Sequence, residues 1–202
     1  MKLKFVPFIA FIFISSFWGC KKGENDPLFS LRTRTNRLSG TWELKKAEWI
    51  KADTTTYFEN GLQVEQTPNN TSDSLPTTII FEFESNGNYS IDKTYNYPDD
   101  FFNNGSIAYE FLYFERGIWN FAGGKNDIPS KSQLVLIKEY SEEKNSIGGS
   151  DVEAIEIENP TNGFIYNIKE LRNDKLVLYY SSTMNTEDGA IINSAELTFE
   201  KL

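Results

Sequence analysis

The sequence predicts an all-β protein, an antiparallel up-and-down β-barrel of roughly eight or nine strands. After Gly40, apolar and polar residues alternate with a period of two, most clearly where Phe81 and Phe83 flank Glu82. No stretch shows the apolar period of about 3.6 residues that is typical of a helix. Turn-forming pairs such as Asn86-Gly87 separate the candidate strands, as in tight hairpins. Because an antiparallel meander must hide its edges, we expect these strands to close on themselves.

The first twenty residues have the three parts of a bacterial secretory signal peptide. Two lysines precede an apolar run from Phe5 to Phe17, which is shorter than the roughly 20 residues that a membrane-spanning helix needs. The run ends at Trp18-Gly19-Cys20, and a cysteine after a small residue at this place resembles a lipobox. The resemblance implies removal of residues 1–19 and attachment of lipid to Cys20.

The anchor predicts where the protein resides. Several acyl chains on one residue give stable membrane attachment, so the membrane is an expected partner through Cys20 alone. Lys21 follows the cysteine, and an Asp at that place would be the inner-membrane retention signal. We therefore expect the bacterial outer membrane, a lipidated tether over residues 20–37 that ends in a short helical turn, and a barrel domain over 38–202.

Composition excludes several classes of function. The 202 residues include no histidine and one cysteine, which excludes imidazole general bases, His-ligated zinc and internal disulfides. The formal charge of −9 argues against nucleic acid as a partner. Carboxylates such as Glu156 and Glu158 share one face of a strand candidate, which is the pattern of a solvated face. We expect neither an enzyme nor a bound metal or cofactor, and we expect a monomer.

The candidate strands combine alternation with β-branched and aromatic residues, and turn or polar residues bound each of them. In chain order they are 41–50, 78–84, 88–95, 107–121 with a bend at Gly117, 133–140, 152–158, 164–171, 175–182 and 195–201. Two long polar connections, 51–77 and 99–106, are expected to be loops. Residues 183–194, which contain Asp188-Gly189, are expected to form a third polar loop.

The start of the first strand carries a family resemblance. Gly40-Thr41-Trp42 resembles the Gly-x-Trp signature of lipocalins. Together with the lipobox, the chain looks like the lipocalin-like lipoproteins of Gram-negative bacteria. The resemblance implies that Trp42 closes one end of a barrel beneath a basic side chain from a late strand. Lys201 is the first candidate for that side chain, and Lys169 and Arg172 are the others. The helix that lipocalins place before their last strand is absent.

Aromatic residues supply the candidate binding groups. Inward side chains of a small barrel either fill it or leave room for one ligand, so the same rings predict a packed core or a binding site. Buried tyrosine hydroxyls need partners, which favours a ligand with a few polar atoms. The candidate ligand contacts are Trp42, Phe81, Phe83, Tyr89, Phe111, Tyr113, Phe164 and Tyr166.

A second group of aromatic residues surrounds one loop, next to Asp99 and Asp100. Flat rings beside carboxylates can stack on a sugar, so the candidate loop contacts are Tyr95, Tyr97, Phe101 and Phe102. The sequence therefore predicts a membrane-anchored protein that binds or carries a small apolar or amphipathic ligand in the cell envelope. The alternative is a surface interaction module without a cavity, whose loops contact glycan or another envelope protein.

Overall fold

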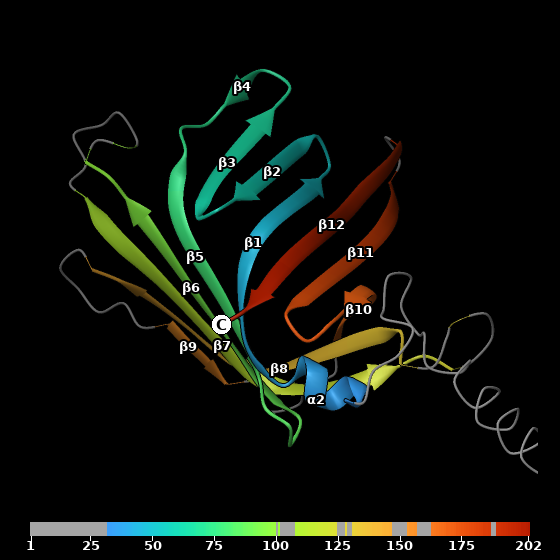
Figure 1. Ribbon diagram of the computed structural model, residues 1–202. Coiled ribbons are helices and arrows are strands. Elements are labelled where there is room, and N and C mark those ends of the chain that lie inside the picture. The colour runs from blue at the N-terminus through green and yellow to red at the C-terminus, as the bar shows by residue number, and fades with distance from the viewer. Residues whose placement is uncertain are drawn as a thin grey trace, which may run out of the picture.

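The protein folds as a closed antiparallel β-barrel with one short helix at one end, as the ribbon shows (Figure 1). The computed structural model describes residues 32–99, 101, 108–124, 128, 131–146, 153–156, 163–186 and 189–202. Its elements are helix α2 (Arg34–Leu38) and the strands β1 (Gly40–Lys51), β2 (Thr54–Glu59), β3 (Leu62–Thr67), β4 (Asn70–Thr71), β5 (Leu75–Phe83), β6 (Asn88–Tyr97), β7 (Tyr109–Ala122), β8 (Gln133–Asn145), β9 (Glu153–Glu156), β10 (Gly163–Leu171), β11 (Lys175–Thr186) and β12 (Gly189–Lys201).

Neighbours in the sequence are neighbours in the sheet, as an up-and-down barrel requires. The last strand closes on the first, with Trp42 opposite Lys201, and β8 closes on β10, with Leu134 opposite Tyr166. Near α2, β1 pairs directly with β5, so eight strands form the ring there. Farther from α2, β2 and β3 are inserted between β1 and β5, so ten strands form it.

The inserted hairpin corrects the expectation that residues 51–77 form a loop. Strands β2 and β3 pair in register from Thr55 opposite Gln66 to Glu59 opposite Leu62. The hairpin turns at Asn60-Gly61, where both residues have positive φ, 50° and 85°. Asn-Gly is the preferred pair for such a turn. The polar composition concealed the hairpin because Phe58 is its one buried side chain among β2 and β3.

The expected loop over 183–194 is also wrong. Strands β11 and β12 continue as a long hairpin whose register runs from Lys175 opposite Glu200 to Thr186 opposite Gly189. The remaining strand predictions are confirmed to within a few residues, and the expected bend at Gly117 is a β-bulge. A Cβ on Gly117 would lie 2.0 Å from the Ile137 carbonyl oxygen and 2.9 Å from the Tyr89 ring. Only glycine fits at this close approach.

The end of the barrel beside α2, here called the closed half, is densely packed. Trp42, Phe83 and Phe199 are among the largest side chains with less than 2% of their surface exposed. Leu38 of α2 joins this core and lies beneath Trp42, whose indole Nε1 donates to the Leu38 carbonyl at 2.6 Å. The helix therefore covers the end of the barrel.

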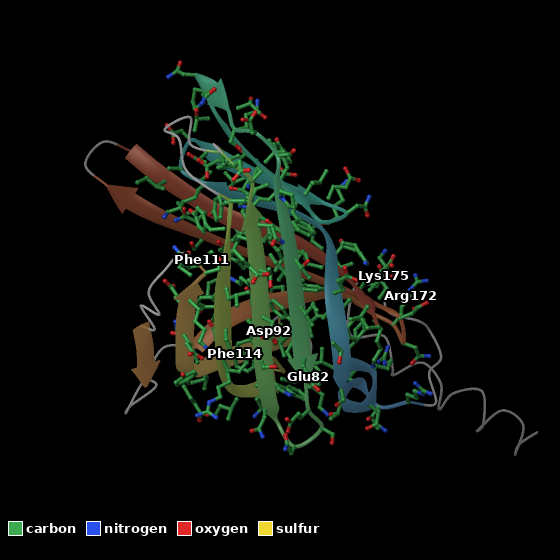
Figure 2. The ribbon with its side chains drawn as sticks, turned by 90° about the vertical axis from the view of Figure 1, so that its left-hand side faces the viewer. Glu82, Asp92, Phe111, Phe114, Arg172 and Lys175 are labelled. Carbon is green, nitrogen blue, oxygen red and sulfur yellow. The ribbon has the colours of Figure 1, made fainter. Side chains whose placement is uncertain are left out.

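Basic side chains complete the closed half. Of the three candidates, Lys201 occupies the place over Trp42, with its ammonium 4.9 Å from the ring centre. It also donates to the carbonyls of Arg37 at 3.1 Å and Ser39 at 2.5 Å. Nearby, the buried carboxylate of Glu170 pairs with Arg172 and Lys175. These two residues lie at the turn between β10 and β11 and are labelled in Figure 2. The charged groups of Lys201 and Glu170 thus have protein partners, which suits a structural role.

Candidate functional site

The register places all eight predicted ligand contacts on the inner wall of the barrel. Trp42 lies opposite Phe81, and Phe83 lies opposite Tyr89. Residues directly opposite each other on neighbouring strands share a face, so these four belong to the face that forms the buried core. The same reasoning places Phe111, Tyr113, Phe164 and Tyr166 on that face, through pairing with inner-wall residues of β6 and β8.

The eight contacts divide into two groups by burial. Trp42, Phe81, Phe83 and Tyr89 are fully packed in the core, so they form a floor. The other four are only partly buried, and Phe164 has 45% of its surface exposed. We call the partly buried inner wall, away from α2, the open half; its residues are Lys93, Tyr95, Phe111, Tyr113, Glu115, Phe164, Tyr166 and Tyr180.

A carboxylate lies at the boundary between the floor and the open half. Glu115 follows Tyr113 by two residues on β7 and therefore shares its inward face. The hydroxyl of Tyr89 donates to Glu115 Oε1 at 2.7 Å, and the hydroxyl of Tyr113 donates to Oε2 at 2.5 Å. Hydrogen bonds to a charged acceptor are roughly twice as strong as neutral ones. Glu115 is thus fixed in place by two phenols.

Burial and this carboxylate keep the tyrosines protonated. Burial is the first cause that raises the pKa of Tyr89 and Tyr113, and the hydrogen bond to Glu115 is the second. Burial also raises the pKa of Tyr166, with smaller contributions from Tyr180 and Glu115. These phenols remain neutral hydrogen-bond donors at any physiological pH.

Lys93 is the cation of the open half. It lies opposite Tyr113 in the register, and its ammonium is 4.8 Å from the centre of that ring. Burial lowers the pKa of Lys93; the negative charge of Glu115 opposes this shift, and the positive charge of Lys138 adds to it. The site therefore contains charges of both signs above an apolar floor.

Two groups of aromatic side chains flank these charges. On one wall Tyr95 and Phe111 have ring centres 5.9 Å apart. On another wall Phe164 contacts Tyr166 and Tyr180, with centre separations of 4.7 Å in each case. The first wall belongs to β6 and β7 and the second to β10 and β11, and β8 lies between β7 and β10 in the sheet.

The predicted loop contacts fall into three places. Tyr95 belongs to the inner wall, not to the loop, because it lies opposite Phe111. Tyr97 stacks on Tyr109 with centres 4.6 Å apart and meets Phe101 edge to face at 5.3 Å. Phe102 lies outside the described residues, as do Asp100 and Cys20. Tyr97, Phe101 and Tyr109 form the rim cluster.

The outer face of the barrel is also hollowed. Figure 2 looks onto the outer face of β5, β6 and β7, where Glu82, Asp92 and Phe114 are labelled. A hollow of about 260 Å³ lies beside Asp92 and Phe114, and burial raises the pKa of that aspartate. A second hollow of about 530 Å³ lies beside Glu82 and Arg116. Both are shallow depressions between outward side chains of one sheet.

Sequence reasoning missed the polar members of the site. Glu115 and Lys93 were left out because candidate contacts were chosen among aromatic side chains. The signal was present, since Glu115 is two residues after Tyr113 and Lys93 is two residues after Ile91. Since side chains alternate between the two faces of a strand, this spacing alone predicts that both residues face inward.

The open half combines a carboxylate, an ammonium and aromatic rings. Within these residues, no group of three or more Cys, Asp or Glu side chains is arranged to hold a metal ion. No helix in the same part of the chain has the length and apolar character needed to cross a bilayer. Comparison with protein-family models and with curated proteins finds no match to this chain.

Proposed function

We propose that this protein is a lipid-anchored, lipocalin-like protein of the bacterial outer membrane that binds a small amphipathic molecule in the open half of its barrel. The observation that carries the proposal is the inner wall itself, where Lys93 and Glu115 lie between aromatic walls above a closed floor. Binding sites for small molecules are typically apolar and aromatic, with a few placed polar groups. The function is binding without catalysis.

Free energy argues against a purely structural role for this half. Moving a charged group out of water costs several kcal/mol unless it is paired. A barrel selected only for stability would fill these positions with apolar side chains, as the closed half does with Phe81 and Leu197. Lys93 and Glu115 instead occupy inward positions that are partly open. Ligand binding supplies a reason for this arrangement.

The path of the chain is compatible with the proposed anchor. The described chain begins at Arg32, next to α2, so it enters at the closed half. From Cys20 to Arg32 a fully extended chain reaches about 40 Å at most. A lipid on Cys20 would hold the closed half toward the membrane and leave the open half accessible from the aqueous side.

The proposal is tested by identifying what the full chain carries. The protein is isolated in lipid nanodiscs from an envelope fraction, and small molecules that accompany it are identified by mass spectrometry against empty nanodiscs. We expect one class of amphiphile, lost in Phe111→Glu. The matched control is Tyr57→Glu, which changes an outward ring that is 43% exposed. Absence of any enriched molecule, or equal loss in both folded variants, contradicts the proposal.

The rim cluster supports one second candidate. Tyr97, Phe101 and Tyr109 gather partly buried rings at the mouth of the barrel, and aromatic rings beside a carboxylate such as Asp99 can stack on sugars. A cavity-less module that contacts glycan or another envelope protein would use this surface. In glycan binding to the immobilised full chain, loss on Tyr97→Ala but not on Phe111→Glu would favour this candidate.

A further inference from the structure

We propose that the open half prefers an amphiphile with a carboxylate head, held by the ammonium of Lys93, over one with a neutral or cationic head. This inference rests on the proposed function and adds the chemical class of the ligand. It follows from which polar atoms of the inner wall are already bonded to protein and which are not.

Among the residues that the structure describes, none accepts a hydrogen bond from the ammonium of Lys93. The one contact of its ammonium within the described part of the chain is the face of the Tyr113 ring, 4.8 Å away. An ammonium has three N–H donors and no acceptor. A contact with a ring satisfies none of them as a hydrogen bond does, so these donors are available to a ligand acceptor.

Each carboxylate oxygen of Glu115 already accepts a hydrogen bond from the protein. One carboxylate oxygen accepts from Tyr89 and the other from Tyr113, at 2.7 and 2.5 Å. A cationic head group would meet a carboxylate whose charge and acceptor capacity are already partly engaged by two charge-assisted hydrogen bonds. A carboxylate head group at Lys93 would compete with none. This difference favours the anionic ligand.

The remaining charges nearby do not reverse this preference. Glu143, opposite Tyr113 in the register, is exposed, so water screens its repulsion of an anion. Lys138 is close enough for its positive charge to lower the pKa of Lys93. An anion placed between them would be attracted to both ammonium groups.

The depth of Lys93 sets the orientation of the ligand. Along β6, Tyr95 and Tyr97 follow Lys93 at two-residue intervals on the same inward face. Four residues of strand span about 13 Å, which separates the ammonium from the rim cluster. The head group therefore lies deep, and a medium-length apolar tail extends past Phe111 toward the mouth.

The experiment compares three amphiphiles that share one tail. The full chain in lipid nanodiscs is photolabelled with decanoate that carries a diazirine near its methyl end. Unlabelled decanoate, decanol and decylamine then compete for the site. Because each competitor also enters the lipid, its potency is expressed against its measured concentration in the nanodisc lipid, and every variant is tested in identical nanodiscs.

In the unmodified protein we expect decanoate to compete better than either other probe. Lys93→Met should weaken decanoate at least about tenfold, since a hydrogen-bonded ion pair is lost, and should leave decanol unchanged. Lys46→Met is the matched control, because Lys46 is exposed on the outer face of β1. If Lys93→Met does not fold, Lys93→Gln is the second variant, since it removes the positive charge but keeps a polar side chain, and it should weaken decanoate in the same way.

The outcomes separate the inference from the proposed function. Equal competition by decanoate and decanol, unchanged in Lys93→Met, overturns the head-group preference and leaves the binding function in place. Stronger competition by decylamine also overturns it. If the probe labels no residue of the barrel interior, the binding function and the head-group preference both fail.

Discussion

The closed and open halves of the barrel interior are built by the same strands but differ in how they treat polar groups. In the closed half, inward positions are apolar and nearly free of exposed surface, and the charged Glu170 and Lys201 have protein partners. In the open half, the inner wall carries a tyrosine-held carboxylate and an ammonium whose contact is a ring. The comparison indicates that the closed half holds the packed core, whereas the open half leaves charged groups and aromatic rings partly exposed.

The strongest test of this division compares two phenylalanines. Phe83 is 1% exposed in the closed half, whereas Phe164 is 45% exposed in the open half. Phe83→Ala should lower the free energy of unfolding by about 3–5 kcal/mol, because it removes a ring and leaves a cavity. Phe164→Ala should lower it by less than about 1 kcal/mol. Chemical denaturation of both variants measures the difference, and equal losses would remove the distinction between the halves.

Glu115 tests whether its hydrogen bonds hold the wall in place. Glu115→Gln keeps the shape but replaces two charge-assisted hydrogen bonds with neutral ones, so it should lower the unfolding free energy by about 1–2 kcal/mol. The control is Glu82→Gln on the exposed outer face of β5, which should change stability by less than about 0.5 kcal/mol. A loss no greater at Glu115 than at Glu82 would show that the tyrosine pairs contribute little.

The smallest expected effect is the contribution of Lys93 to the pH dependence of the unfolding free energy. Its pKa in the folded protein is lowered from the ordinary 10.5, mainly by burial, so its charged form opposes folding. That opposition is fully present below the lowered pKa and disappears as the pH rises to the value of the unfolded chain. The groups facing it are Tyr95 on β6, Tyr113 and Glu115 on β7, and Lys138 and Glu143 on β8.

The measurement is the unfolding free energy of Lys93→Met relative to the unmodified protein, between pH 7 and 10.5. The unfolding free energy of the unmodified protein should rise relative to that of Lys93→Met as the pH rises through this range. A difference that stays constant with pH, or that moves in the opposite direction, would mean that Lys93 is well solvated in the folded state.

Most of the fold follows from the two-residue period of the sequence. Strands such as β5 and β12 bury every second residue, so alternation marks them clearly. The sequence pattern did not predict the hairpin of β2 and β3, because Phe58 alone is buried there and one buried ring leaves no periodic signal. Its one local sign was Asn60-Gly61, a pair whose positive φ values suit a tight turn.

The candidate site was less predictable, for a physical reason. Apolar side chains were assigned to the inside because burial favours them, so the rule fails wherever function places a charge inside. It found the aromatic walls at Phe111 and Phe164 and missed Lys93 and Glu115. The same rule could not distinguish the fully buried floor from the partly buried wall of the open half, since that difference depends on how the strands pack around the barrel. Trp42 and Phe111 both face the inside of the barrel, but Trp42 is fully buried and Phe111 is only partly buried.

The most direct test of the account is to map which residues of β7 the tail of the diazirine decanoate labels. Along this strand Phe111 and Tyr113 face inward, whereas Leu112 and Phe114 face outward. Because the methyl end lies toward the mouth, we expect labels on Phe111 and on Tyr109, the inward residue opposite Tyr97, with no labels on Leu112 and Phe114, and loss of the labels in the presence of excess decanoate. Labels on Leu112 and Phe114 instead would place the amphiphile on the outer face and contradict the claim that the open half is the binding site.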